Sequence, residues 1–308
     1  MMLLQQELAY QLMLPEYNLL QENGKMRAIR DYLQKVSETL LTNLQHAARV
    51  NIARPSAVEK LFGFPDKNAL PALKFSRGEI NIQVRGKIDR FDIQDNTQVF
   101  GTIIDYKSSG KQFDWGQAFD GLQMQLLTYW QAAQMNAEAL GVEAIGVAFF
   151  AQIAPQKRLI SDFKGDVSAL LDGQVRPDIF KYRGLFVSEE DYIDILDNLS
   201  DSNISQFYQL KKKNDGELYA NSDFVAAQDF ALLLKRNTDN IMFAGERILA
   251  GLFPLKPTAA SLQYTPYGDI LRFDRSLGDT YRPEAPKGKA NILKILQEAD
   301  DNGDNIYN

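Results

Sequence analysis

Two short stretches of the sequence combine carboxylates with a lysine in a pattern that could support chemistry. GKIDRFD carries Asp89, and IIDYK carries Asp105 and Lys107. Residues two apart on a strand point to the same face, so Asp105 and Lys107 would share one face. Two carboxylates on neighbouring strands can hold one hard divalent cation, with the backbone carbonyl of Tyr106 as a further oxygen ligand. The pattern therefore predicts a metal site where two strands end.

The available donor atoms favour one class of metal. Carboxylates and carbonyls suit Mg²⁺ or Mn²⁺, whereas zinc prefers histidine and cysteine. The chain has no cysteine, and its one histidine, His46, lies in LQHAARV, which indicates a helix surface. Beside such a metal, Lys107 would act on an attacking water or stabilise charge that develops on a phosphate.

A third stretch, GLQMQLLTYW, places two polar side chains where they could assist. Gln125 and Tyr129 are four residues apart, so a helix would put both on one face. Glu59, in SAVEKLFGF, is an acidic candidate for the edge of the site, and a purely structural role for it stays open. Each piece alone is common, and Asp-x-Lys at a strand end also fits a surface ion pair. The order of the three stretches is the specific feature.

The elements that must position these residues follow from the hydrophobic pattern. Apolar residues at three- and four-residue spacing predict two helices within residues 1–50, broken near Gly24. From residue 79 the period changes to two, which predicts a strand, an Asp-Asn turn and a second strand ending at 107. A helix over 115–141, a buried strand over 142–153 and a long helix over 222–251 follow, whereas 155–221 is weakly patterned. This order predicts an α/β core in which a helix is the crossover.

Composition limits the class of protein. The chain has 308 residues, of which 45% are hydrophobic and 24% charged, as in ordinary globular proteins. A net charge of −6 argues against a generally basic nucleic-acid coat, although a local basic channel stays open because a field depends on where charges lie. No apolar run reaches the roughly 20 residues that span a bilayer, and the N-terminus lacks a signal-peptide pattern. We expect a soluble, cytoplasmic protein without a membrane partner.

The ordered set GKIDRFD, IIDYKSSGK and GLQMQLLTYW resembles the RecB-like branch of the PD-(D/E)XK nucleases. It is most similar to the C-terminal nuclease domain of the AddB/RexB subunits of bacterial helicase–nucleases, above all over residues 78–150. The resemblance implies a restriction-endonuclease-like α/β core, with a central mixed sheet flanked by helices. It also implies three regions: a helical lead-in at 1–75, a nuclease core with insertions at 76–251, and a C-terminal wrap at 252–308.

The resemblance further implies roles for the residues of the site. Asp89 and Asp105 would be metal ligands, Lys107 the catalytic lysine, and Gln125 and Tyr129 the supporting pair. The implied activity is Mg²⁺- or Mn²⁺-dependent hydrolysis of single-stranded DNA, delivered by a helicase in an AddA/RexA-type partner subunit. The implied setting is double-strand-break resection and recombinational DNA repair.

The sequence departs from the family pattern in two places. The family's Cys-x-x-Cys-x5-Cys segment supplies ligands to an iron–sulfur cluster, and here the three positions are Leu262, Thr265 and Leu271. No iron–sulfur cluster is therefore expected, and we expect the two leucines to pack where the cluster would have pinned the tail. The family's early histidine or acidic ligand is not matched by His46. We expect that ligand in sequence that this chain lacks, as in an excised C-terminal fragment.

Two other classes of protein stay open. One is a DNA-binding or scaffolding module that keeps the fold and cleaves nothing. The intact Asp89, Asp105 and Lys107 count against it, because two converging carboxylates repel each other unless a metal relieves them. The other is a free-standing, Cas4-like exonuclease, which the helical first 75 residues and the long segment at 155–251 disfavour. Metal binding without cleavage would favour the first class, and co-purification with a helicase would exclude the second.

Overall fold

The computed structural model describes residues 2–51, 53–95, 98–108, 110–153, 181–187, 192–193, 196–197, 203–205 and 207–302. The chain divides into two compact units, each assembled from three separate stretches. Unit 1 comprises Met1–Leu61, Lys87–Phe113 and Ala133–Ala226, and unit 2 comprises Phe62–Gly86, Asp114–Ala132 and Ala227–Asn308. The resemblance implied three continuous regions, at 1–75, 76–251 and 252–308. The two units are a division of a different kind, so these regions stay a prediction.

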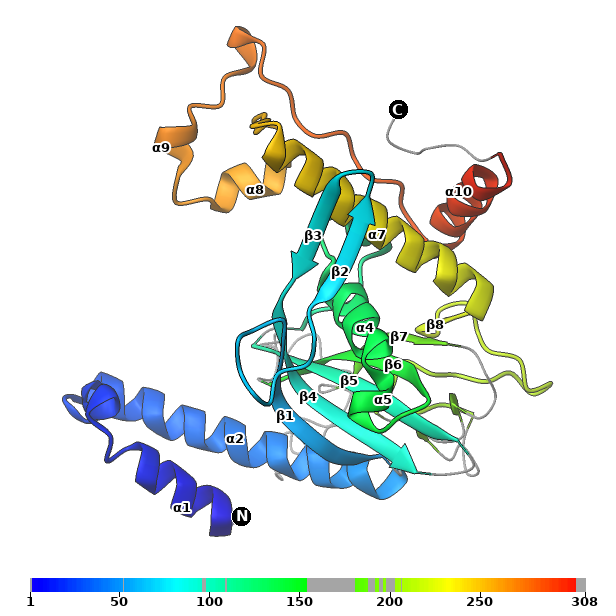
Figure 1. Ribbon diagram of the computed structural model, residues 1–308. Helices are drawn as coiled ribbons and strands as arrows, with labels where there is room; N and C mark the ends of the chain where they lie inside the picture. The colour runs from blue at the N-terminus through cyan, green and yellow to red at the C-terminus, as the bar shows by residue number, and fades with distance from the viewer. Residues whose placement is uncertain are drawn as a thin grey trace. The chain divides into compact units, whose positions relative to one another are not determined.

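Unit 1 is built on a mixed sheet of six strands in the order β1-β4-β5-β6-β7-β8 (Figure 1). The strands are β1 (Arg54–Phe62), β4 (Gly86–Asp95), β5 (Val99–Lys107), β6 (Ala144–Gln152), β7 (Arg183–Val187) and β8 (Phe224–Val225). The β4–β5 and β6–β7 pairs are antiparallel, whereas β5–β6 and β7–β8 are parallel. The predicted mixed-sheet α/β class is confirmed. Residues 96–97 of the predicted turn in QDNTQ (94–98) and residues 155–180 of the weakly patterned stretch lie outside the described residues.

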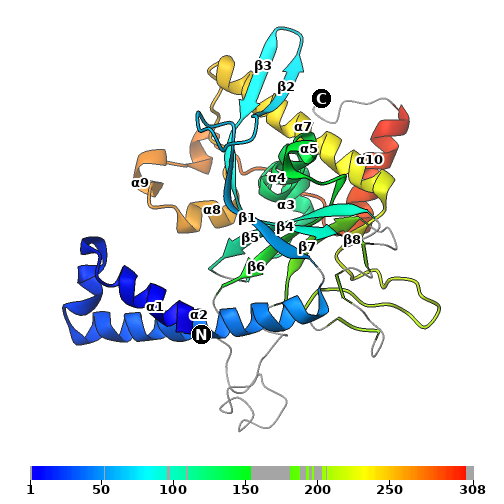
Figure 2. The same cartoon turned by 60° about the horizontal axis from the view of Figure 1, so that its bottom comes forward.

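Helix α2 (Gly24–Val50) lies along one face of this sheet (Figure 2). It begins at Gly24, as the predicted break between two helices requires. Ala47 of α2 joins a buried apolar cluster with side chains from β5 and β6, among them Ile104 and Phe149. Since successive side chains of a strand alternate between faces, the odd-numbered residues 103, 105 and 107 of β5 lie on the face away from α2. Asp105 and Lys107 therefore lie on the face of the sheet opposite the apolar cluster.

The stretch predicted as one helix over 115–141 forms three helices. These are α3 (Trp115–Phe119), α4 (Gln125–Met135) and α5 (Ala137–Leu140). The prediction of one continuous helix is wrong, because Gly121 takes a φ of 73° and the chain leaves the helical conformation there. The three helices still connect the parallel strands β5 and β6, which is the crossover that the sequence predicted.

Unit 2 contains a hairpin and a long helix. Strands β2 (Leu73–Arg77) and β3 (Ile80–Val84) are antiparallel, and α7 covers Ala227–Leu249. Arg77 forms ion pairs with Asp239 and Glu246 of α7. Helix α10 (Lys289–Asn302) buries Ile292 and Leu296. The predicted strand near residue 80 therefore pairs within this hairpin, separately from the strand that carries Asp89.

Between α7 and α10 the chain forms short helices. These are α8 (Ala259–Tyr264), α9 (Gly268–Leu271) and the 3₁₀ helix η5 (Arg275–Leu277), and none of the three buries a residue. Leu271 is 39% exposed, so the expectation that it packs in place of a cluster is wrong. Helices of six and four residues present too little apolar surface to bury one face.

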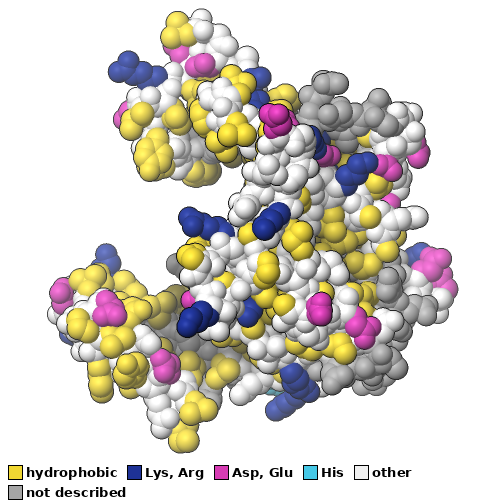
Figure 3. Space-filling view, in the orientation of Figure 1, with side chains coloured by type: hydrophobic (Ala, Val, Ile, Leu, Met, Phe, Trp, Pro, Cys, Tyr) yellow, Lys and Arg dark blue, Asp and Glu magenta, His cyan; other side chains and the backbone are white. Residues whose placement is uncertain are grey.

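Hydrophobic side chains are also exposed at the start of the chain. Helix α1 (Met2–Gln11) and the 3₁₀ helix η1 (Pro15–Gln21) contain no buried residue. Figure 3 shows hydrophobic side chains on the surface of this region and of the α8–α9 segment. In the described ranges, no helix combines the length and the apolar character that crossing a bilayer requires.

Candidate active site

The register of β4 and β5 brings the two predicted carboxylates together. The paired residues of the two strands run to Arg90 and Ile104, so Asp89 and Asp105 each lie one residue beyond the last pair. The Asp89 carboxylate is near enough to Asp105 to raise the pKa of its carboxyl. The backbone N–H of Tyr106 donates a 2.8 Å hydrogen bond to Asp89 Oδ2, which ties the two strand ends to each other. The two carboxylates are therefore neighbours on the face away from α2.

Asp105 lies in surroundings that disfavour its charge. Its side chain is 1% exposed and forms an ion pair with Lys107 Nζ. Burial raises the pKa of the Asp105 carboxyl and the Asp89 carboxylate raises it further, whereas Lys107 and Lys111 lower it. A buried carboxylate that repels a second one is an arrangement that a bound cation relieves. Two carboxylates without nitrogen or sulfur donors fit Mg²⁺ or Mn²⁺.

Two lysines lie over one aromatic ring beside these carboxylates. Nζ of Lys107 is 5.5 Å and Nζ of Lys111 is 5.2 Å from the ring centroid of Phe150, on β6. Phe150 is the partner of Asp105 in the parallel register, and it is 1% exposed. An ammonium group at this distance from a ring face is held by cation–π attraction. The ring thus places two positive charges next to the carboxylate pair.

The sequence prediction assigned Lys107 to the site and did not include Lys111 or Phe150 among the site residues. Lys111 follows Lys107 by four residues across a glycine-containing loop, and this spacing was one reason to leave a local basic channel open. No sequence feature distinguished Phe150 from the other apolar residues of its strand.

Glu59 lies on β1 and forms an ion pair with Lys87 of β4. Its backbone takes a φ of 52°, which is uncommon for a residue other than glycine. Lys87 precedes Asp89 by two residues and so shares its face. In the part of the chain that the structure describes, no three acidic or histidine side chains form a group that could hold a metal. A role for Glu59 at the edge of the site stays a prediction.

Gln125 and Tyr129 lie on α4, within unit 2. Gln125 Nε2 donates a 3.1 Å hydrogen bond to Tyr129 Oη, which confirms that the two side chains share one helix face. The Tyr129 ring meets Phe62 edge-on, with 6.0 Å between the centroids. Gly86 completes this packing, because a Cβ at Gly86 would lie 2.6 Å from the Phe62 ring. The first glycine of GKIDRFD is therefore needed for close packing in unit 2.

Two further candidate ligands have defined positions. Tyr106 lies between Asp105 and Lys107 on β5, and its carbonyl as a metal ligand stays a prediction. His46 lies on α2, which covers the opposite face of the sheet from Asp105.

Comparisons with known proteins agree with this arrangement. A family model described as PD-(D/E)XK nuclease superfamily matches residues 3–264. The ATP-dependent helicase/deoxyribonuclease B-type subunit of Leuconostoc citreum is 63% identical over 92% of this chain and 24% of its own length. The protein of that name from Leuconostoc mesenteroides is 53% identical over 97% of this chain and 25% of its own length. The one from Oenococcus oeni is 33% identical over 96% of this chain and 27% of its own length.

The chain spans about a quarter of the length of the curated relatives it matches. The family match nevertheless covers most of this chain, and it includes both strand-end carboxylates, Lys107 and the Gln125–Tyr129 pair. The resemblance that the three sequence stretches indicated is confirmed: the chain belongs to the PD-(D/E)XK nuclease superfamily.

Proposed function

We propose that this chain is a divalent-metal-dependent nuclease domain that hydrolyses phosphodiester bonds of single-stranded DNA. The observation that carries the proposal is the convergence of Asp89, buried Asp105 and Lys107 on one face of two adjoining strand ends. Relatives named as helicase/deoxyribonuclease subunits support DNA as the substrate and a helicase-containing complex as the setting. The proposal includes an AddA/RexA-type partner subunit, a role in double-strand-break resection, and the cytoplasm as the location.

Asp89 and Asp105 would hold the metal, together with the carbonyl of Tyr106. When bound, Mg²⁺ or Mn²⁺ supplies Lewis-acid stabilisation of phosphate charge and acidifies water. The protein's own contribution is orientation: the Tyr106 N–H holds Asp89 Oδ2, and Lys107 holds Asp105. The ammonium of Lys107 is positioned to orient the attacking water or to donate to a phosphate oxygen as negative charge develops there.

The charges of the site support a two-phosphate contact. Counted as formal charges, the carboxylates of Asp89 and Asp105 contribute −2 and the ammonium groups of Lys107 and Lys111 contribute +2, so the four side chains sum to zero. One divalent cation raises this sum to +2, which balances two phosphodiester groups of a DNA strand. Lys107 would then serve the scissile phosphate and Lys111 a neighbouring one, while Gln125 and Tyr129 would contact the substrate backbone.

The proposal is tested by digestion of end-labelled single-stranded DNA by the chain, alone and with its helicase partner, in Mg²⁺, Mn²⁺ or EDTA. We expect cleavage that needs the metal and that Lys107→Ala slows by about 10²–10³. The labelled end that disappears first reports the polarity. Lys294→Ala, at an exposed lysine of α10, is the control and should cleave normally. Metal binding without cleavage in the presence of the partner would overturn the proposal in favour of a scaffold. Unchanged Mg²⁺-dependent cleavage by Asp105→Ala would place the site elsewhere.

A further inference from the structure

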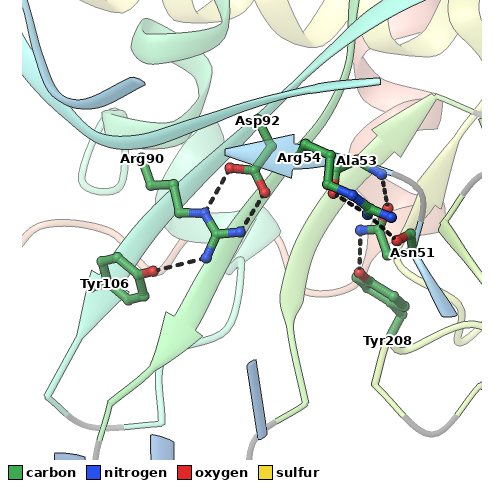
Figure 4. Close-up of polar contacts among 7 residues, drawn as sticks. All are labelled: Asn51, Ala53, Arg54, Arg90, Asp92, Tyr106 and Tyr208. Atoms are coloured by element: carbon green, nitrogen blue, oxygen red, sulfur yellow. Dashed lines mark hydrogen bonds and ion pairs between the residues drawn. The ribbon is translucent and has the colours of Figure 1, made fainter. Parts of the chain in front are cut away.

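Figure 4 shows a buried ion pair between Arg90 and Asp92 on β4. Because side chains alternate along a strand, this pair lies on the face opposite Asp89. Arg90 donates to Asp92 Oδ1 from Nε and to Asp92 Oδ2 from Nη2, both at 2.6 Å. Arg90 Nη1 donates to Oη of Tyr106 at 3.3 Å. The side chains of Arg90 and Asp92 are 16% and 3% exposed. The guanidinium therefore connects β4 to β5 on the face away from the candidate active site.

The members of this cluster adjoin the site in sequence. Arg90 follows Asp89, and Tyr106 lies between Asp105 and Lys107. Tyr106 is held twice by β4: its hydroxyl accepts from Arg90, and its backbone N–H donates to Asp89 at 2.8 Å. The backbone from which Asp105 and Lys107 project is thus fixed from both faces of the sheet.

The ion pair lies beside a small polar cavity. A cavity of about 20 Å³, lined by Arg90, Asp92 and Thr102 from the sheet and by Asn51 after α2, is the size of a single water site. Although burial lowers it, hydrogen bonding to Asp92 raises the pKa of the Arg90 guanidinium above its ordinary value. The guanidinium of Arg90 therefore keeps its charge.

Stability alone does not explain such a pair. Replacing a buried ion pair by apolar residues of similar volume is often neutral or stabilising, because desolvation offsets the attraction. What apolar residues could not reproduce is the directed contact from the guanidinium to Tyr106. Because Arg90 follows Asp89 and Tyr106 follows Asp105, this contact can affect the positions of the two carboxylates.

We propose that Arg90 is a positioning residue that, through Tyr106, sets the separation of Asp89 and Asp105 for metal binding. The inference rests on the proposed function of the carboxylate pair. It predicts that losing the guanidinium weakens metal binding without unfolding the sheet. Partners that orient metal ligands typically contribute about 10–100-fold to metal affinity.

The test uses a double variant and a matched pair of tyrosine variants. Arg90→Met with Asp92→Leu removes both charges together, so that no buried charge is left unpaired. Tyr106→Phe removes only the hydroxyl that accepts from Arg90. Tyr208→Phe is the control, because Tyr208 Oη accepts a 2.8 Å hydrogen bond from Asn51 at the same cavity but does not adjoin the carboxylates in sequence.

Each protein is measured for Mn²⁺ affinity by calorimetry and for Tm in EDTA. We expect the folded double variant to bind Mn²⁺ at least about tenfold more weakly than wild type. The Mn²⁺ affinity of Tyr106→Phe should lie between those of the double variant and the wild type. Tyr208→Phe should lower Tm and leave Mn²⁺ affinity unchanged. A folded double variant with wild-type Mn²⁺ affinity would overturn the proposal.

If the double variant does not fold, Arg90→Lys decides the question. A lysine ammonium group can still pair with Asp92, but it lacks the several N–H donors with which the guanidinium contacts Asp92 and Tyr106 at the same time. Mn²⁺ affinity should therefore fall in Arg90→Lys. Unchanged Mn²⁺ affinity would overturn the proposal. Wild-type protein that binds Mn²⁺ but cleaves no DNA would overturn the nuclease function alone, and the affinity comparison would still decide the role of Arg90. Wild-type protein that binds no Mn²⁺ would overturn both proposals.

Discussion

The backbone N–H of Tyr106 donates to the carboxylate of Asp89 at 2.8 Å, where the antiparallel ladder between β4 and β5 ends at the Arg90–Ile104 pair. A side chain thus takes over the role that a backbone carbonyl has along the rest of the ladder. The orientation of Asp89 is consequently set by the neighbouring strand, whereas Asp105 is held by Lys107 from its own strand.

This relationship makes Asp89→Asn an informative change. Asparagine keeps an oxygen that accepts from the Tyr106 N–H, so the fold should be preserved. The charge is lost, and Mn²⁺ affinity measured by calorimetry should fall by more than about tenfold, because affinity follows the charge of the ligands. If this variant bound Mn²⁺ with wild-type affinity, Asp89 would not be a metal ligand.

Lys107→Ala should separate binding from chemistry. Metal affinity should be retained, because both carboxylates remain, while the single-turnover rate of DNA cleavage should fall by about 10²–10³. The check is Mn²⁺ calorimetry and quenched-flow cleavage on the same preparation. A rate within threefold or so of wild type would show that the lysine has no role in the transition state.

Lys111→Gln should weaken DNA binding and leave the chemical step nearly unchanged. Removing one phosphate contact lowers the slope of log affinity against log salt by about 0.7 for a single strand. The slope is measured by fluorescence anisotropy with Ca²⁺ in place of Mg²⁺. Lys294→Gln on α10, whose side chain is 71% exposed, should keep the wild-type slope. An unchanged slope in Lys111→Gln would contradict the two-phosphate contact.

Asp105→Asn should not destabilise the metal-free protein at neutral pH. Because burial raises the folded-state pKa of Asp105 above its ordinary 3.8, the folded protein binds this proton more tightly than the unfolded chain. Binding of this proton stabilises the folded protein fully at pH values below the ordinary pKa of 3.8. This stabilisation is lost as the pH rises through the raised pKa of Asp105 in the folded protein.

The measurement is Tm in EDTA as a function of pH. At pH 7 the asparagine variant should melt at or above the wild-type temperature, and its advantage should shrink as the pH falls to about 4. Mg²⁺ should stabilise the wild type more than the variant. A variant that melts well below wild type in EDTA at pH 7 would contradict the burial effect.

Gly86→Ala should destabilise the protein by about 1–3 kcal/mol through overpacking. The added methyl group would lie 2.6 Å from the Phe62 ring and 3.3 Å from the Tyr129 ring, and both distances are closer than ordinary contact. Gly24→Ala at the start of α2, where no atom lies within 4 Å, is the control and should be neutral or stabilising. Urea unfolding of both variants checks this, and equal midpoints would argue against close packing at Gly86.

The strand pair and its charged ends could be predicted from local sequence alone. Alternation with period two depends only on backbone geometry, so β4, β5 and the shared face of Asp105 and Lys107 follow without any knowledge of the fold. The spacing of Gln125 and Tyr129 is local in the same sense, and their hydrogen bond confirms the shared face.

Other features depend on contacts between residues distant in the chain, and local pattern cannot predict these. The closeness of Asp89 to Asp105 and the position of the Phe150 ring beneath two lysines arise only when β4, β5 and β6 pair. The contact from Arg90 to Tyr106 spans sixteen residues and two strands.

The two wrong predictions have the same origin. The helical pattern over 115–141 persists through Gly121, but Gly121 takes a φ of 73°, and a Cβ there would lie 3.1 Å from the side chain of Asn240 on α7. The apolar character of Leu271 predicted burial, yet the side chain is 39% exposed. Local sequence thus determines element type and the face on which a side chain lies. Tertiary packing decides which faces meet, because the free energy of burial depends on both partners.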